Sequence, residues 1–275
     1  MISKNDIYAY KDLSRVLLHT SEFICISPHL GLKRYTSNYS FAFLSKNFIP
    51  DGFTIMPSGC ATFTITKSSS NLFFSVDGPT LKPYIVGSEN NQIEMEIAIE
   101  FKPAGLYALT GITQSELTDS TNPFDAVDPK LTKLILDTIE QTNNINELVA
   151  KLDILLLHSV CAEYNPQLKV AFQSIFAGVY SAKTLSDETH YSERQLNRIF
   201  QQHVGLNAKA FARLVRFYKV VRLMKKPFNS LAFISDAADF YDFSHFSREF
   251  KLVCGKTPQE FRDNMSDFYI NTTKI

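Results

Sequence analysis

The sequence predicts an α+β protein, in which a β-rich, barrel-like N-terminal half with some helices is followed by an all-α C-terminal half. Three observations predict this division. Short stretches with alternating apolar residues, separated by Pro and Gly turns, fill the first half. Near Asp128 the apolar spacing changes to that of helices. Beyond Asn165 nearly every stretch has helical spacing, and one pair of helices is repeated.

The N-terminal half contains two clear strand signals. The run IEMEIAIEF, residues 93–101, has apolar residues at every odd position, which is typical of a half-buried strand. The run ATFTITKSSSNLFFSVDGPT, residues 61–80, places two β-rich stretches around a polar turn. Four phenylalanines in this half are either ordinary core residues or the lining of an apolar ligand pocket. They are Phe41, Phe43, Phe63 and Phe73.

Two helices should close the N-terminal half. The runs PKLTKLILDTIEQ and INELVAKLDILLLH carry apolar residues at helical spacing. Their dense apolar content favours packing against the β-rich part, and a homodimer interface is the alternative.

Composition excludes several classes of protein. The 275 residues are 45% hydrophobic and 20% charged, which is globular composition. The N-terminus lacks the apolar region of a signal peptide, and no apolar run is long enough to cross a bilayer, so we expect a cytoplasmic protein that does not bind membranes. The four cysteines are scattered, and the first 150 residues contain only two histidines, His19 and His29. We therefore expect no metal, no cofactor and no enzymatic activity.

The net charge of zero hides an asymmetry along the chain. Residues 1–180 carry 13 Lys and Arg against 18 Asp and Glu, whereas residues 181–263 carry 14 against 9. A basic region beside an acidic one is a recognised feature of nucleic-acid-binding proteins.

The basic region contains an internal repeat with an offset of fifty residues. Each copy is a short helical segment followed by an amphipathic one, and four pairs of residues match: Leu196 with Phe246, Arg198 with Arg248, Phe200 with Phe250, and Gly205 with Gly255. Each Gly suits a left-handed helix C-cap. Between the copies, residues 207–226 lack Gly and Pro and predict one long helix.

Each amphipathic segment has a helix start signal and a polar, cationic outer face. Ser192 and Gln195 fit a capping box, and Asp242 is a good N-cap. The outer faces carry short polar residues and arginine, which suit the major groove of DNA, where arginine pairs with guanine. A long helix of roughly 30 Å could hold two such segments in successive major-groove segments, about 34 Å apart.

Residues 167–262 resemble the DNA-binding domain of AraC/XylS-type regulators. The resemblance lies in SERQLNRIFQQHVG, RLVRFYKVVRLM and FISDAADFYDFSHFSREFKLVCGKTPQEFR. It implies seven helices that form two helix-turn-helix units, at about 183–204 and 231–253, joined by the helix 207–226. The sequence departs from the family at Asp239, where Gly is common, and at Ser186 and Ser235, where Ala is usual. Asp239 could therefore reshape the second turn.

The resemblance also implies which residues contact double-stranded promoter DNA, and it implies RNA polymerase as a partner. The residues implied in base reading are Arg194, Asn197, Arg198, Phe243, Ser244, Ser247 and Arg248. Those that we expect at the phosphate backbone are Ser192, Gln201, Arg216, Arg222, His245 and Lys251.

Residues 1–164 resemble, less specifically, the β-rich sensor domain of the DUF6597 type found in one group of these regulators. The matching runs are IMPSGCATFTIT, YIVGS and EIAIEFKPAGLYALTG. This implies a regulatory domain with a small-molecule effector, preceding a DNA-binding domain over 165–275. An N-terminal domain that serves only oligomerisation or partner binding is the alternative, and an enzymatic one is a more distant alternative.

Overall fold

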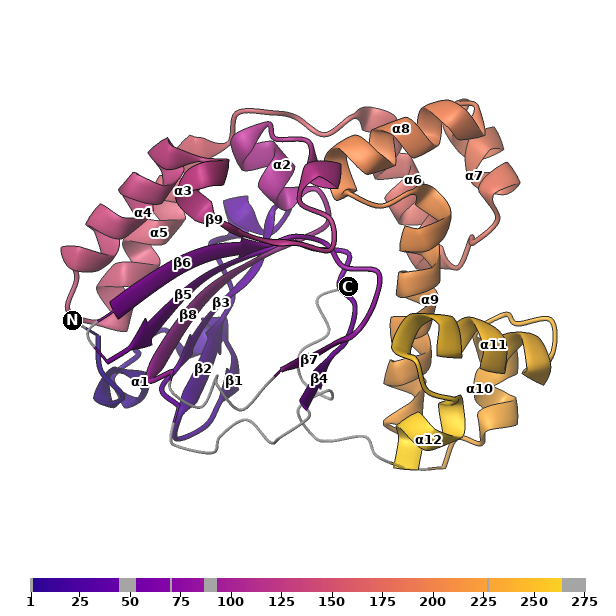
Figure 1. Ribbon diagram of the computed structural model, residues 1–275, viewed down its shortest axis with the longest axis horizontal. Helices are drawn as coiled ribbons and strands as arrows, with labels where there is room; N and C mark the ends of the chain where they lie inside the picture. The colour runs from indigo at the N-terminus through magenta and orange to yellow at the C-terminus, as the bar shows by residue number, and fades with distance from the viewer. Residues whose placement is uncertain (1, 45–52, 70, 87–92, 227, 264–275) are drawn as a thin grey trace.

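The computed structural model describes residues 2–44, 53–69, 71–86, 93–226 and 228–263. Its N-terminal part is a curved sheet with helices packed on one side, and its C-terminal part is helical (Figure 1). Two separate hydrophobic cores correspond to these parts.

The main sheet has seven strands in the order β1-β2-β3-β8-β5-β6-β9, and each neighbouring pair is antiparallel. A second sheet pairs β4 with β7. The strands are β1 (Val16–His19), β2 (Phe23–Ile26), β3 (Thr36–Ala42), β4 (Phe53–Ile55), β5 (Thr62–Ser68), β6 (Asn71–Asp77), β7 (Tyr84–Val86), β8 (Met95–Phe101) and β9 (Thr121–Pro123). The sheet is open, with β1 and β9 at its edges, so the expected barrel is not closed.

The predicted strand patterns are confirmed. Strands β5 and β6, which lie within residues 61–80, pair antiparallel as expected, and Met95, Ile97, Ile99 and Phe101 of β8 all point into one core. The α-helices described in this part of the molecule are α1 (Asn5–Tyr8), α2 (Gly105–Thr110), α3 (Phe124–Val127), α4 (Pro129–Glu140) and α5 (Ile145–Ser159). The described 3₁₀ turns are η1 (Leu13–Arg15), η2 (Leu30–Leu32) and η4 (Gln114–Glu116).

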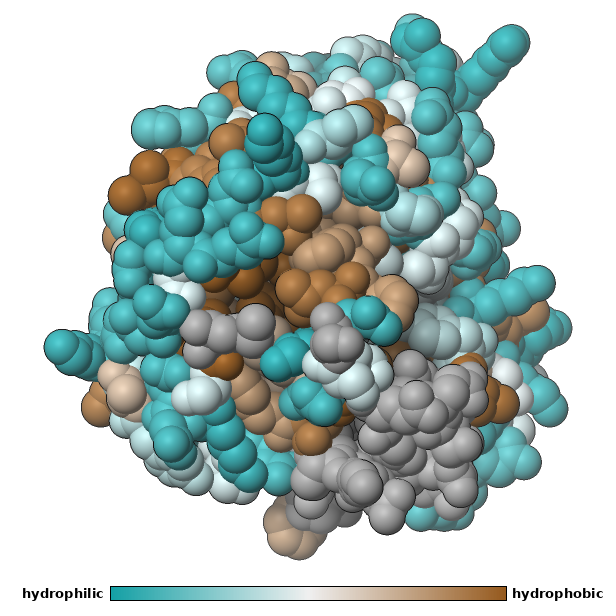
Figure 2. All heavy atoms as spheres, turned by 60° about the vertical axis from the view of Figure 1, so that its left-hand side comes forward, coloured by the Kyte–Doolittle hydropathy of each residue, from teal (hydrophilic) through white to brown (hydrophobic). Residues whose placement is uncertain are grey.

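Helices α4 and α5 pack on the sheet, as the sequence favoured. Asp128 caps α4 and Asn144 caps α5, each by accepting a hydrogen bond from a backbone N–H. The apolar faces of both helices share the core with the strands. Figure 2, in which the left-hand side of Figure 1 comes forward, shows hydrophobic atoms in a hollow bordered by hydrophilic side chains.

The four phenylalanines predicted as a possible pocket do not share one environment. Phe41 and Phe63 are fully buried in the core, and Phe43 packs at its margin. Phe73 lies on β6 with its side chain 56% exposed, opposite Thr66 of β5. Because side chains alternate along a strand, Phe73 points away from this core. The structure therefore corrects the grouping, and packing explains Phe41 and Phe63.

A buried carboxylate ties α5 to the sheet and to the N-terminal segment. Asp153 accepts hydrogen bonds from the Tyr39 hydroxyl at 3.0 Å and the His29 backbone N–H at 2.9 Å. It also forms an ion pair with Arg15 at 2.8 Å, and its side chain is only 8% exposed. Burial and the nearby Asp153 raise the pKa of Tyr39 far above its usual value, so the phenol remains the donor.

The C-terminal part contains the two expected helix pairs and the helix between them. Its helices are α6 (Pro166–Ala177), α7 (Ala182–Thr189), α8 (Glu193–Val204), α9 (Ala208–Met224), α10 (Leu231–Ala237), α11 (Phe243–Cys254) and α12 (Pro258–Asp263). Asn207 caps α9, and Figure 1 shows α9 joining the two pairs. At 1.5 Å per residue, α9 is roughly 25 Å long.

Candidate nucleic-acid interface

Helix α8 is the amphipathic helix of the first pair. Ser192 and Gln195 form the predicted capping box. The Ser192 hydroxyl oxygen accepts a hydrogen bond from the Gln195 backbone N–H, and the Gln195 side-chain oxygen accepts from the backbone N–H and the hydroxyl of Ser192. Its inner face is fully packed against α6, α7 and α9. The outer face forms an open concavity that is lined by Glu193, Arg194, Gln195, Asn197, Arg198 and Gln201. Arg194 and Arg198 are exposed on it, which is the placement that base reading requires.

Helix α11 is the equivalent helix of the second pair. The Asp242 carboxylate accepts a hydrogen bond from the His245 backbone N–H at 2.6 Å, as an N-cap does. Phe246 and Phe250 are buried, and Phe250 packs on Phe217 of α9 and on Phe261 of α12. Phe243, Ser244, Arg248 and Lys251 are exposed, and Ser247 is half-buried on the same helix. Phe243 is 50% exposed, and its ring packs edge-on against Phe246.

Asn197 has a structural role that the sequence did not indicate. Its side-chain oxygen accepts a hydrogen bond from the Ala208 backbone N–H at 3.1 Å. This bond links α8 to the first turn of α9. Bidentate recognition of adenine needs both the oxygen and the nitrogen of the amide. Asn197 keeps its amide nitrogen and one acceptor site of its oxygen, so its predicted role in base reading stays a prediction.

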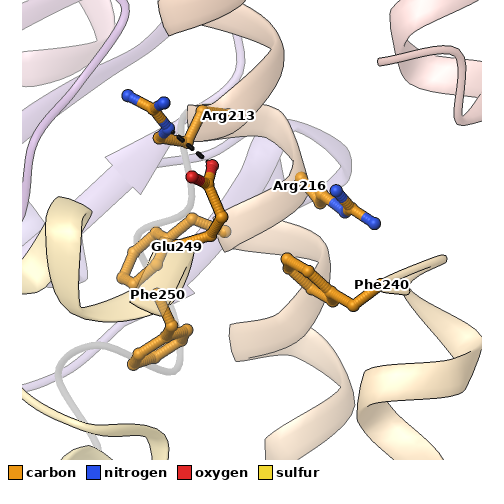
Figure 3. A pocket seen from close by; sticks show the side chains of 6 residues that line it. Arg213, Arg216, Phe240, Glu249 and Phe250 are labelled. Atoms are coloured by element: carbon orange, nitrogen blue, oxygen red, sulfur yellow. Dashed lines mark hydrogen bonds and ion pairs between the residues drawn. The ribbon is translucent and has the colours of Figure 1, made fainter. Parts of the chain in front are cut away.

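Arg216 is the clearest departure from the predicted phosphate contacts. Its guanidinium donates to the backbone carbonyls of Ala238 and Asp239, and it lies 3.6 Å from the centre of the Phe240 ring. Figure 3 shows this side chain reaching from α9 towards Phe240. Tyr180 stacks against it at 5.0 Å. Burial lowers the pKa of Arg216. These contacts support the backbone of the second turn, and the phosphate contact of Arg216 stays a prediction.

Asp239 takes the backbone conformation that Gly usually supplies in this turn. Its φ is +60°, in the left-handed region. Arg216 binds its carbonyl, and Lys219 pairs with its carboxylate at 3.2 Å. The first turn has the same conformation at His190, where φ is +56°. Both units therefore form complete turns, and the sequence departure at Asp239 is accommodated.

The geometry at Asp239 makes a prediction about stability. Asp239→Gly should change the free energy of unfolding by no more than about 0.5 kcal/mol, because Gly removes the left-handed strain but also loosens the unfolded chain. Asp239→Val should destabilise by about 1–2 kcal/mol, because a β-branched residue fits φ > 0 poorly. Urea unfolding followed by circular dichroism measures both. Equal losses in the two variants would contradict the assigned backbone conformation.

The second turn is one residue longer than the first. Two residues, Tyr191 and Ser192, follow His190 before α8, whereas three residues separate Asp239 from α11. Phe240 packs on Phe246 in the core. The additional residue, Tyr241, is 92% exposed directly before the N-cap of α11. Sequence reasoning missed it, although the position is visible when the two copies are aligned at their αL residues.

The other residues predicted to contact the phosphate backbone of DNA lie at the surface, in a helix cap or partly buried. Gln201, Arg222 and Lys251 are exposed, so each is placed where a phosphate could reach it. Ser192 is engaged in the capping box. His245 is half-buried, and its ring packs edge-on against Phe240. Arg213, another cation of α9, pairs with Glu249 at 2.8 Å (Figure 3).

The N-terminal domain contacts the first helix pair and α9. The Thr118 hydroxyl donates to the Gly205 carbonyl at 2.8 Å, and the Tyr107 ring lies 4.0 Å from that of His203. The Tyr218 hydroxyl donates to the Pro57 carbonyl at 2.7 Å. Gly205 has φ +84°, and a Cβ there would lie 2.8 Å from the Thr118 hydroxyl oxygen. Gly205 is therefore both a helix C-cap and a close-packed contact between the domains.

The described part of the chain holds neither a candidate metal site nor a membrane span. It contains no group of three or more His, Cys, Asp or Glu that could hold a metal ion. None of its helices combines the length and the apolar character that crossing a bilayer requires.

Comparison with known proteins identifies the helical part. Residues 185–264 match the family model described as "Helix-turn-helix domain". A segment of 104 residues is 28% identical to the Msm operon regulatory protein of Streptococcus mutans, and it covers 38% of this chain and 37% of that relative.

Two solved structures of ToxT from Vibrio cholerae are similar over most of the chain. The structure of ToxT from strain O395 has a TM-score of 0.40 at 12% identity, and the match covers 92% of this chain and 98% of the ToxT chain. That of ToxT with bound unsaturated fatty acid has a TM-score of 0.39 at 11% identity and covers 92% and 95%. The family match and the helix geometry together show that residues 185–264 form a helix-turn-helix domain.

Proposed function

We propose that this protein is a sequence-specific transcription regulator of the AraC type, which acts in the cytoplasm on promoter DNA. The supporting observation is the pair of capped helices α8 and α11, which present exposed arginines on helices held by one rigid α9. Each helix would enter one of two successive major-groove segments. Arg194, Arg198, Ser244, Ser247 and Arg248 would read bases, assisted by Phe243.

The domain division that goes with this function is an N-terminal regulatory domain over residues 1–164 and a DNA-binding domain over 165–275. The direct contacts from Thr118 and Tyr218 to the helix-turn-helix region support a regulatory coupling between them. A small-molecule effector, RNA polymerase and a second copy of the chain are the partners that such a regulator would use. An N-terminal domain that serves only oligomerisation would show no effector-dependent DNA binding.

Selection of bound sequences from a random duplex library, at two salt concentrations, tests this function. Two short motifs about one helical turn apart are expected, because α9 separates two reading helices. A single motif would mean that the second unit only anchors the protein. Absence of enrichment both with the full chain and with residues 167–275 would contradict the proposal.

Substitutions on the two helices separate base reading from phosphate binding. Arg198→Ala and Arg248→Ala should each weaken binding to the selected site by about 1–3 kcal/mol and relax preference at one position. Arg222→Ala, as the matched control, should weaken all sequences alike and reduce the salt dependence. Titration of fluorescent duplexes by anisotropy measures both effects. Unchanged affinity in both helix variants would exclude α8 and α11 as the readers.

A further inference from the structure

One exposed tyrosine in the second unit has no counterpart in the first. Tyr191 and Phe240 each follow the left-handed residue of their turn, and both pack on the core of the helical part. In the first unit the N-cap Ser192 comes next, whereas in the second unit Tyr241 intervenes before the N-cap Asp242. The Tyr241 side chain is 92% exposed, so packing within the chain does not explain it.

The backbone on both sides of Tyr241 is held in place. On one side, the Phe240 N–H donates to the Ser235 carbonyl at 3.1 Å, and the Phe240 and Phe246 ring centres are 5.0 Å apart. On the other side, Asp242 caps α11. Because this backbone is fixed, a partner that orders Tyr241 restricts only the torsions of its side chain, which costs little entropy. Tyr241 is therefore presented from a rigid site.

The Tyr241 hydroxyl is a hydrogen-bond donor that the chain itself does not use. Among the described residues, the Tyr241 side chain forms neither a hydrogen bond nor a ring contact. On the other side of the N-cap, Phe243 is half exposed, and Ser244 and Arg248 are exposed further along α11. Tyr241 thus lies at the N-terminal end of the helix whose exposed residues we propose as base readers.

The position of Tyr241 favours the DNA backbone over the bases. In helix-turn-helix proteins the first residues of the recognition helix contact base edges, whereas polar side chains, tyrosine among them, position the protein on the phosphates. Tyr241 precedes the first residue of α11, Phe243, by two positions. The Asp242 carboxylate beside it repels phosphate at short range. A long, rigid side chain can carry a neutral donor past that charge.

We propose that Tyr241 contacts the DNA backbone at the half-site that α11 reads, where its hydroxyl donates a hydrogen bond to one phosphate oxygen. The first turn lacks a residue at this place, so the second half-site is held by one additional neutral donor. The contact rests on the proposed function. It adds a DNA-binding residue that lies outside both recognition helices and carries no positive charge.

Binding of the full chain to two duplexes tests the proposal. One duplex carries the selected site and the other an unrelated sequence, and fluorescence anisotropy is measured over a range of salt concentrations. Tyr241→Phe should weaken binding to both duplexes by about three- to tenfold, because it removes a single hydrogen bond to a charged group. The salt dependence should stay as in the wild type, because a neutral donor releases no counterion.

Two variants serve as controls. Tyr8→Phe removes the hydroxyl of another exposed tyrosine, in the N-terminal part of the chain, and should leave the affinity unchanged. Arg222→Ala should reduce the salt dependence, which shows that the measurement detects a charged contact. Urea unfolding should give Tyr241→Phe the stability of the wild type, because the hydroxyl has no partner among the described residues.

A neutral analogue of the backbone locates the contact. Methylphosphonate replaces one phosphate at a time along the half-site that α11 reads. At one position it should weaken binding by the wild type but not by Tyr241→Phe, since the variant has no hydrogen bond there to lose. Equal losses in both proteins at every position would overturn the proposal.

Three further results would also overturn it. They are unchanged affinity in Tyr241→Phe, a changed preference at one base pair, which would assign Tyr241 to base reading, and lost regulation at the promoter with normal DNA affinity, which would assign it to a protein partner. If Arg198→Ala and Arg248→Ala weaken binding and Tyr241→Phe does not, the Tyr241 contact is wrong and the proposed function stands. If none of the three weakens binding, both are wrong.

Discussion

Asp153→Ala is expected to lower the free energy of unfolding of the N-terminal domain by about 3–5 kcal/mol. The carboxylate is 8% exposed and serves three partners from separate segments, namely Arg15, His29 and Tyr39. Its removal leaves a partly buried cation, a phenol and a backbone N–H without an acceptor. Each of these groups was desolvated on folding, so each adds a penalty.

Urea unfolding followed by circular dichroism measures this loss. Asp153→Asn keeps an acceptor oxygen for Tyr39 and His29 and loses only the ion pair, so its loss should be smaller. Glu147→Ala is the control, because its exposed pair with Lys151 contributes no more than about 0.5 kcal/mol. If Asp153→Ala lowers the free energy of unfolding by less than about 1 kcal/mol, water replaces the carboxylate and the Asp153 network does not stabilise the fold.

Arg216→Ala is expected to destabilise the second helix-turn-helix unit by about 2–4 kcal/mol. The substitution removes two hydrogen bonds to the turn carbonyls of Ala238 and Asp239 and the stacking on Phe240. Without these contacts, the left-handed backbone conformation of Asp239 is less stable. Base preference at the site read by α11 should therefore weaken, while preference at the site read by α8 should remain.

Two variants and one measurement distinguish this role from phosphate binding. Arg216→Lys should not restore stability, because an ammonium cannot reproduce the planar, stacked fork. Lys219→Ala, the matched control, removes a partly exposed pair and should cost less than about 1 kcal/mol. Normal stability in Arg216→Ala, together with uniformly weaker DNA binding and lower salt dependence, would instead support the phosphate contact that the sequence predicts.

The sequence predicts the local structure of the recognition helices well, because their signals are local. Ser192 with Gln195, and Asp242, are capping signals within one turn of the helix that they start. The two glycines, Gly205 and Gly255, mark the ends of both helices at positive φ. These features need no knowledge of the rest of the chain.

The roles of Arg216 and Asn197 could not be predicted from the same signals. Both residues have the type and spacing of DNA contacts, and their partners, the 238–239 turn and the Ala208 N–H, are set by tertiary packing. A cation on an amphipathic helix carries no local mark that distinguishes a phosphate ligand from a support for a neighbouring turn.

The phenylalanine pocket illustrates a different limit. Strand alternation correctly separates Phe63 from Thr62 and Thr64, yet alternation alone does not say which face the helices cover. The structure shows that the aromatic face lies under α3, α4 and α5 and that the opposite face is polar. The face of the sheet that forms the apolar core is therefore identified only once the topology is known.

The contacts of the N-terminal domain with Gly205 and Tyr218 have a consequence for promoter sequence. The Gly205 contact lies at the end of α8, in the unit that we propose reads the first half-site, whereas Tyr218 lies on α9 beside Phe217, which packs on α11. A signal that passes through the Gly205 contact would thus alter the proposed first half-site contact more directly than the second. Promoters with a weak first half-site should respond most to the signal, whereas a promoter with a strong one should be occupied in either state.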